Sequence, residues 1–239
     1  MGISAMPKNG RTKNLVVYEK LRQKIIKGKL QPGQKLVMAS LARTFSCSET
    51  PVREAIRRLE SDGYVTFTPH SGAVVTQIND RELSEIYLIR ISLEALATRL
   101  AVPFIRRNDL AWLKKKNHEM KMAVRKNRYE RLAVLNKEFH LRIYKTAPYP
   151  RLYKMVSDLW DAFERWPSIF TYVPERAASA IHEHEQIIEA LSTADIDRAD
   201  SLMKEQKKNT MKALQNYMLQ LNTASPEVLE EIWRKQVGR

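Results

Sequence analysis

Arginine and hydroxyl side chains gather in one short stretch of the chain, residues 48–58. Ser48 and Thr50 stand where a helix is predicted to begin, and Arg53 and Arg57 share one face of it because they are four residues apart. Hydroxyls and helix N-terminal N–H groups bind phosphate oxygens, and an arginine can donate two hydrogen bonds to guanine in the major groove of DNA. The stretch therefore predicts a DNA-contacting helix, although a merely solvated helix face would have a similar composition.

A second set of polar residues stands among apolar ones later in the chain: Arg90, Asn136, His140, His184 and Gln206. Asn136 and His140 lie four residues apart, hence on one helix face, and Gln206 follows His184 by 22 residues. Imidazoles at helical spacing can bind a divalent metal inside a helical bundle, and a metal with open positions can hold a small carboxylate. A lone histidine on a helix is more often a buried structural residue, so both interpretations stand at this point.

The helices and strands that must position the DNA-contacting residues can be predicted from the sequence around them. Apolar residues recur at helical spacing in three segments, and β-branched residues then flank a Pro-His-Ser-Gly turn that carries His70 and Gly72. The predicted helices cover residues 15–27, 39–45 and 50–62, and the predicted strands cover residues 64–68 and 73–77. Helix, helix, turn, helix and hairpin in this order predict a winged helix-turn-helix over residues 14–78, preceded by a basic flexible arm at residues 1–13.

The second set of polar residues requires a different scaffold. After residue 78 the pattern is helical and no further strand is predicted, so the fold class is mostly α, with an all-α bundle of six or seven helices over residues 79–222 and a C-terminal helix or tail at residues 223–239. The predicted helices lie near residues 80–104, 107–127, 129–147, 151–166, 175–192, 195–222 and 226–236.

Charge and composition limit the function. Residues 1–78 hold 13 Lys or Arg and 5 Asp or Glu, a net charge of +8, which leaves +6 for the other 161 residues. This concentration of positive charge predicts a polyanionic partner. The single cysteine, Cys47, excludes an intramolecular disulfide, and neither a signal peptide nor about 18 consecutive apolar residues is present. We therefore expect a cytoplasmic protein that does not span a membrane.

One run of residues resembles the DNA-binding domain of the GntR family of bacterial transcription regulators. The resemblance covers about residues 14–78 and is carried by Tyr18-x-x-Leu21, Gly28-x-Leu30-x-Pro32-Gly33, Leu41-Ala42 and Ser48-Glu49-Thr50-Pro51-Val52-Arg53-Glu54-Ala55-Ile56-Arg57-Arg58-Leu59-Glu60. It implies that Ser48, Thr50 and Arg53 contact DNA from the recognition helix, and that His70 and Gly72 belong to a wing that enters the minor groove. Glu49 stands where the family usually has arginine, so a different operator preference or a side chain turned aside is expected.

The helical part resembles the ligand-sensing FCD domain of one GntR subfamily. The resemblance covers roughly residues 82–215 and rests on Arg90 with Leu93-Glu94, on Phe139-His140, and on His184-Glu185-x-Ile187-Ile188-x-Ala190. It implies a metal ion held by one Asp and three His, with an effector carboxylate bound by the metal and an arginine like Arg90. His140 and His184 keep this pattern, but Asn136 and Gln206 replace the Asp and one His. A zinc or nickel site and a metal-free pocket for a polar or acidic effector both remain open.

Both resemblances together imply a homodimeric transcription regulator, with a repressor favoured. We expect it to bind a near-palindromic operator in double-stranded DNA and to respond to a small carboxylate-bearing metabolite. One alternative is a metal-dependent enzyme in which Glu138, His140 and His184 act on a small acid. Another is a DNA-binding architectural protein that binds no ligand at all.

Overall fold

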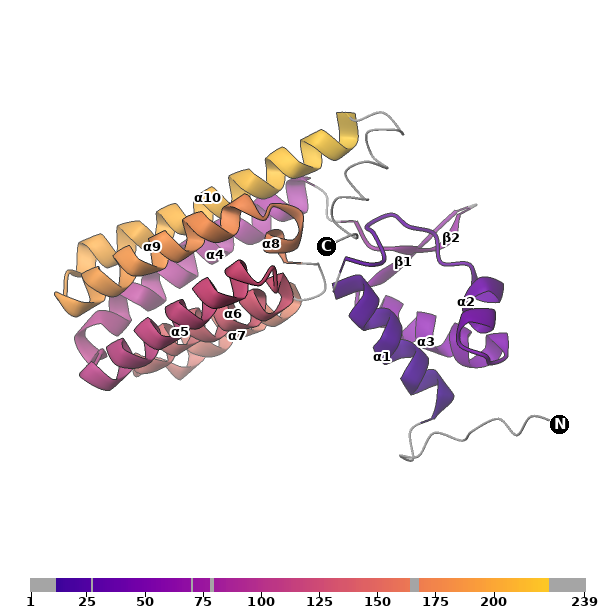
Figure 1. The fold of residues 1–239 in the computed structure, drawn as a ribbon, viewed down its shortest axis with the longest axis horizontal. Helices are drawn as coiled ribbons and strands as arrows, with labels where there is room; N and C mark the ends of the chain where they lie inside the picture. The colour runs from indigo at the N-terminus through magenta and orange to yellow at the C-terminus, as the bar shows by residue number, and fades with distance from the viewer. Residues whose placement is uncertain (1–11, 27, 70, 78–79, 164–167, 224–239) are drawn as a thin grey trace. The chain divides into compact units, whose positions relative to one another are not determined.

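The chain divides into two units, Met1–Gln77 and Ile78–Arg239, each with a hydrophobic core of its own (Figure 1). The structure is a computed structural model, and it describes residues 12–26, 28–69, 71–77, 80–163 and 168–223.

The first unit contains three helices followed by a two-stranded antiparallel sheet. Its elements are α1 (Lys13–Ile26), α2 (Met38–Thr44), α3 (Glu49–Ser61), β1 (Val65–Thr68) and β2 (Gly72–Val75). The sheet register pairs Val65 with Val75 and Thr68 with Gly72. This order confirms the predicted winged helix-turn-helix with its small hairpin.

Packing of α3 against α1 builds the core of the first unit. The apolar residues of α3 recur at positions i, i+3, i+4 and i+7, so they form one buried face: Val52, Ala55, Ile56 and Leu59. Val17, Leu21 and Ile25 of α1 belong to the same core. The turn between α2 and α3 is tight, and Ser46 adopts a φ of 49° there. Because one face of α3 is buried, its polar residues must lie on the opposite face.

The loop before α2 is tied to the hairpin. The Gly33 N–H donates to the Val75 carbonyl at 2.8 Å, and Lys35 forms an isolated antiparallel bridge with Val74. Gly33 has a φ of 79°, a left-handed conformation that residues with a side chain rarely adopt. The hairpin is thereby fixed to the body of the unit.

The second unit is helical throughout its described part. Its elements are α4 (Asp80–Ala101), the 3-10 turn η1 (Val102–Phe104), α5 (Arg107–Arg125), α6 (Tyr129–Thr146), α7 (Pro150–Phe163), α8 (Ile169–Tyr172), α9 (Glu175–Ser192) and α10 (Ile196–Thr223). Figure 1 shows long helices running side by side, with α10 along α4. This arrangement confirms the predicted all-α bundle. The short helix α8 was not predicted, and the helix expected at residues 226–236 lies outside the described residues.

The core of the second unit is mostly apolar, but it includes one cluster of charged and polar side chains. Leu83, Leu113, Met120, Leu135 and Phe139 are completely buried. Several charged and polar side chains are buried beside them: Arg90, Glu94, His140, Arg176, His184, Gln206 and Lys207. Burial of ionised groups is costly unless they are paired, so this polar cluster is the feature of the bundle that requires an explanation. No helix among the described residues is long and apolar enough to cross a membrane.

Candidate functional site

The exposed face of α3 carries the residues that the sequence assigned to DNA. Ser48 occupies the N-cap position, and Glu49, Thr50, Arg53 and Arg57 are exposed on the side opposite the core. The Arg53 side chain is 58% exposed, and its Nη2 lies 3.9 Å from Oε2 of Glu49. An exposed ion pair at this distance is weak, so Arg53 can leave Glu49 for a DNA base without a large loss.

Arg58 differs from the other two arginines of α3. Its guanidinium lies 4.5 Å from the centre of the Tyr18 ring on α1. The Tyr18 hydroxyl donates to Asp62 at 2.6 Å, and burial together with this hydrogen bond raises the pKa of Tyr18 to about 12. Arg58 therefore helps to join α3 to α1, whereas Arg53 and Arg57 remain available to a ligand.

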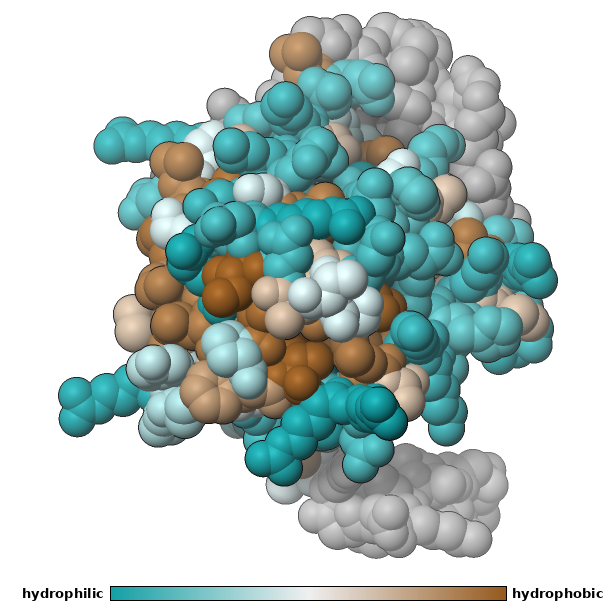
Figure 2. All heavy atoms as spheres, turned by 90° about the vertical axis from the view of Figure 1, so that its left-hand side faces the viewer, coloured by the Kyte–Doolittle hydropathy of each residue, from teal (hydrophilic) through white to brown (hydrophobic). Residues whose placement is uncertain are grey.

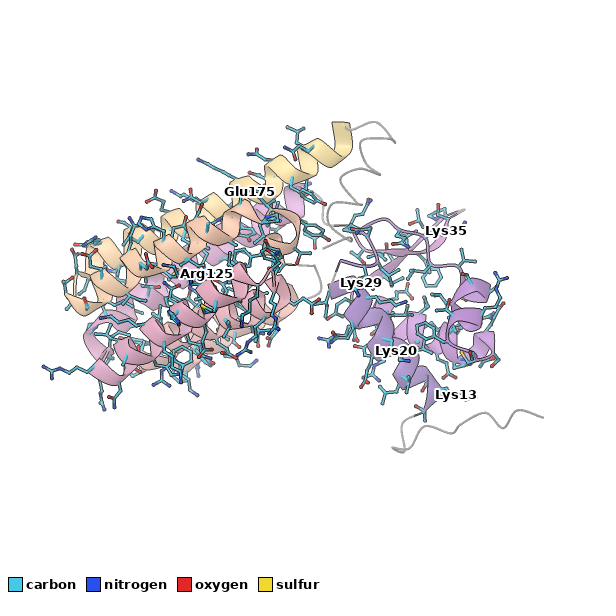
Figure 3. All side chains as sticks on the ribbon, viewed as in Figure 1. Lys13, Lys20, Lys29, Lys35, Arg125 and Glu175 are labelled. Carbon is cyan, nitrogen blue, oxygen red and sulfur yellow. The ribbon has the colours of Figure 1, made fainter. Side chains whose placement is uncertain are left out.

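The hairpin and the surrounding lysines extend the cationic surface. Gly72 is exposed at the start of β2 with a φ of 75°, and a side chain there would meet no atom within 4 Å. His70 lies outside the described residues. Figure 3 labels Lys13 and Lys20 on α1 and Lys29 and Lys35 in the loops that follow. These cations can contact phosphates independently of base sequence.

The second candidate site is the buried polar cluster of the helical unit, and the Glu94 carboxylate lies at its centre. Its Oε1 accepts from Nε of Arg90 at 2.6 Å. Its Oε2 accepts from the hydroxyl of Tyr144 at 2.6 Å and from the indole N–H of Trp160 at 3.2 Å, and it lies 3.0 Å from Nζ of Lys207. Burial would raise the pKa of Glu94, but Arg90 and Lys207 outweigh it and hold that pKa below its ordinary value. Glu94 is an ionised carboxylate that serves four donors.

Two histidines meet beside this carboxylate. Nε2 of His140 on α6 lies 3.3 Å from Nε2 of His184 on α9 and 3.3 Å from Nζ of Lys207 on α10. Burial, and then the charge of Lys207, lower the pKa of both imidazoles well below 6.5, so both are neutral. The Tyr144 hydroxyl donates to Glu94 and lies 3.3 Å from Nδ1 of His140. This arrangement assigns the His140 proton to Nδ1 and leaves Nε2 as an acceptor facing Lys207.

Arg176 and Gln206 form the other side of the cluster. Nη2 of Arg176 donates to Glu183, to the backbone carbonyl of Gln206 at 3.3 Å and to the Thr210 hydroxyl at 3.1 Å. Nε and Nη1 of Arg176, Nε2 of Gln206 and Nδ1 of His184 are buried and have no partner among the described residues. Three N–H donor groups and one imidazole nitrogen are therefore available to a ligand in the same region.

The structure brings together four of the five residues that the sequence assigned to an effector. Arg90, His140, His184 and Gln206 all belong to the buried cluster. Asn136 lies half-buried one turn before His140, and within the described residues no hydrogen bond links its amide to the cluster. Lys207 and Arg176 were missed, because lysine and arginine on a helix are ordinarily solvated. Glu94 was noted beside Arg90 but not assigned, and its i, i+4 spacing from Arg90 was the available signal.

The residues present do not fit the zinc or nickel site that the resemblance implies. Among the described residues, no group of three or more His, Cys, Asp or Glu side chains could hold a metal ion. The two imidazoles are accompanied by amides instead of a carboxylate and a third imidazole, and Glu94 is already occupied by four donors. Thus no step of the function is assigned to a metal.

Comparisons with known proteins match both units of the chain to known domains. Residues 13–75 match the family described as bacterial regulatory proteins, gntR family, and residues 85–206 match the FCD domain. The HTH-type transcriptional regulator McbR of Escherichia coli K12 is 35% identical over 159 residues, which cover 65% of this chain and 72% of McbR. The uncharacterized HTH-type transcriptional regulator YdhC of Bacillus subtilis 168 is 28% identical over 77% of this chain and 83% of YdhC.

A solved structure supports the same assignment. The structure of E. coli McbR/YncC is similar with a TM-score of 0.63 and 28% identity, and the match covers 87% of this chain and 99% of the other. These relatives are transcription regulators, so the enzyme alternative built on Glu138, His140 and His184 is set aside. With a helix-turn-helix domain and an FCD domain in one polypeptide, the chain belongs to the GntR family of bacterial DNA-binding transcription regulators, in the subfamily with an FCD domain.

Proposed function

We propose that this chain is a cytoplasmic repressor whose operator affinity changes when a small carboxylate-bearing metabolite binds in the buried cluster of the helical unit. The observation that carries the proposal is the set of unpartnered buried donors: Nε and Nη1 of Arg176 and Nε2 of Gln206. A buried N–H group without a partner costs about 1–3 kcal/mol. A carboxylate has two acceptor oxygens and would satisfy these groups when bound.

Arg176 is a better anchor for the effector carboxylate than Arg90. The guanidinium of Arg90 already donates to Glu94 and lies 4.3 Å from the centre of the Trp160 ring. Glu94 already neutralises the charge of Arg90, whereas Arg176 has two buried nitrogens without a partner, so an acid can add to Arg176 without breaking an ion pair. Arg90 would then position Glu94, and the neutral His184 would hydrogen-bond a second polar group of the effector.

A thermal-shift screen of small mono-, di- and tricarboxylates tests the effector site. A ligand selective for the folded state must raise the melting temperature by mass action. The same compound should change operator affinity by about five- to 150-fold at constant salt concentration. If no acid shifts the melting temperature or the operator affinity, the chain is the ligand-independent DNA-binding protein and the effector proposal is wrong.

Substitutions in the buried cluster test whether the effector binds beside Arg176 and Gln206. Arg176→Met should abolish the thermal shift by the acid, and Gln206→Glu should do so by repulsion with little change of shape. Arg198→Met is the matched control, because Arg198 forms an exposed ion pair with Glu189 on the same two helices, α9 and α10. An unchanged ligand affinity in folded Gln206→Glu would contradict the placement.

For the DNA half we propose that Ser48, Thr50, Arg53 and Arg57 contact the major groove, and that Gly72 and His70 form the wing contact. Glu49 changes the operator preference rather than weakening binding, since a carboxylate can accept from the amino group of cytosine. Selection of operators from a random DNA library with wild type and Glu49→Arg tests this, and identical consensus sequences would contradict it.

We also propose a homodimer on a near-palindromic operator. Leu88, Ile89 and Leu96 are 62%, 41% and 44% exposed and lie on one side of α4, which a second copy of the chain could cover. Figure 2 shows apolar side chains gathered in the middle of the face turned toward the viewer, with hydrophilic ones above and below them. Light scattering should give the mass of a dimer for wild type and the mass of a monomer for Leu88→Glu. Met155→Glu is the control, because Met155 is an exposed apolar residue on a different helix, α7, and this variant should remain a dimer. A monomeric wild type would exclude this proposal.

A further inference from the structure

The buried cluster contains a cation, the ammonium group of Lys207. Burial lowers the pKa of Lys207 to about 8 against the attraction of Glu94, so the group is mostly protonated at neutral pH. The Lys207 side chain is 5% exposed, and its Nζ lies 3.0 Å from Oε2 of Glu94, 3.3 Å from Nε2 of His140 and 3.5 Å from Oε1 of Gln206. The Trp160 ring lies beneath it, with 5.1 Å between Nζ and the ring centre. A carboxylate, an imidazole, an amide oxygen and an aromatic face therefore surround this one ammonium group.

We infer that the Lys207 ammonium takes the place of the divalent metal that the resemblance to FCD domains implies, so that the sensing site works without metal. The acceptor Nε2 of His140, which would be a metal ligand, faces Nζ of Lys207 instead. His184 Nε2 reaches the same point from α9. The ammonium is thus the positive charge toward which these side chains converge.

Electrostatics make a divalent ion and Lys207 incompatible. Lys207, Arg90 and Arg176 already place three positive charges in the buried region, and Glu94 and Glu183 are their carboxylate partners. A metal ion between the imidazoles would lie a few ångströms from the ammonium, where repulsion in a medium of low dielectric is strong. Neither oxygen of Glu94 can compensate, because both already accept from other donors.

Lys207 would also give the site its affinity for anions. Its charge, like that of a metal ion, attracts a carboxylate, and Arg176 lies on the other side of Gln206 with two unpartnered nitrogens. This part of the inference rests on the proposed effector function. The metal part does not, so the two can fail separately.

The test compares metal binding in four untagged proteins: wild type, Gln206→His/Lys207→Met, His140→Ala and Lys208→Met. Lys208 is the exposed neighbour of Lys207 on α10 and provides the matched control. Each protein is incubated with zinc or nickel and dialysed, and its metal content is measured by elemental mass spectrometry beside its melting temperature with and without the metal. Circular dichroism shows whether each variant is folded.

Wild type and Lys208→Met should retain far less than one metal per chain and show no metal-dependent shift of the melting temperature. Gln206→His/Lys207→Met adds an imidazole and removes the competing charge, so it should bind about one zinc or nickel per chain. Stoichiometric metal in wild type, lost in His140→Ala, would overturn the inference. A folded double variant that binds no metal would also overturn it, because Lys207 would then not occupy a metal position.

Failure of the effector proposal has a different signature. If wild type binds no metal and the double variant does, but no carboxylate shifts the melting temperature of wild type, the substitution of metal by Lys207 stands and the proposed effector class is wrong.

Discussion

Arg53→Ala gives the sharpest test of how the first unit recognises DNA. The side chain is 58% exposed, and its ion pair with Glu49 spans 3.9 Å. Loss of an exposed pair of this kind costs about 0–1 kcal/mol of folding free energy. A bidentate contact to guanine contributes about 1–3 kcal/mol of discrimination. We therefore expect operator affinity to fall by about five- to 150-fold while the free energy of unfolding barely changes.

The assay is a fluorescence-anisotropy titration at fixed salt concentration against the selected operator and against a scrambled duplex of equal length. Arg53→Ala should weaken binding to the operator much more than binding to the scrambled duplex, because base contacts, unlike phosphate contacts, depend on sequence. Arg58→Ala is the control: its guanidinium lies on the Tyr18 ring, so its loss should lower stability by about 0.5–1 kcal/mol and leave the operator preference intact. Equal losses on both duplexes for Arg53→Ala would refute base recognition and leave a phosphate contact.

Three further predictions concern stability and are measured by urea unfolding. Glu94→Gln removes the carboxylate that pairs with the buried cations Arg90 and Lys207, so it should lower the free energy of unfolding by about 3–5 kcal/mol. The control Glu189→Gln breaks an exposed ion pair and should lower it by less than about 1 kcal/mol. Similar losses for the two variants would show that the buried ion pairs of Glu94 do not form in solution. Phe139→Ala, at a completely buried position, should cost about 3–5 kcal/mol, and Val134→Ala, 49% exposed on the same helix, should be nearly neutral. Gly72→Ala should lose about 1–2 kcal/mol through its left-handed backbone alone, since its added methyl group meets no atom, and an unchanged stability would contradict the observed φ of 75°.

The architecture followed from local patterns in the sequence. Apolar residues at helical spacing, β-branched runs around a Pro-His-Ser-Gly turn, and helix breakers between segments are properties of neighbouring residues, and they predicted the helix-turn-helix, the hairpin and the all-α bundle. Boundaries moved by a few residues: the strands expected at 64–68 and 73–77 are Val65–Thr68 and Gly72–Val75. The helix Ile169–Tyr172 was missed because a single turn is too short to show a period.

The chemistry of the buried cluster depended on tertiary structure. Residue spacing identified His140 and His184 as candidate ligand-binding residues. It could not show that Nζ of Lys207, 67 residues further along the chain, would lie 3.3 Å from Nε2 of His140. Nor could it show that Arg176 would be buried with two unpartnered nitrogens. A lysine or arginine on a helix is solvated by default, and only the packing of α10 on α4 and α9 removes these two from water. Sequence determines which groups are present, whereas the charges that surround each group, and so its partner and its pKa, are decided by packing between distant segments.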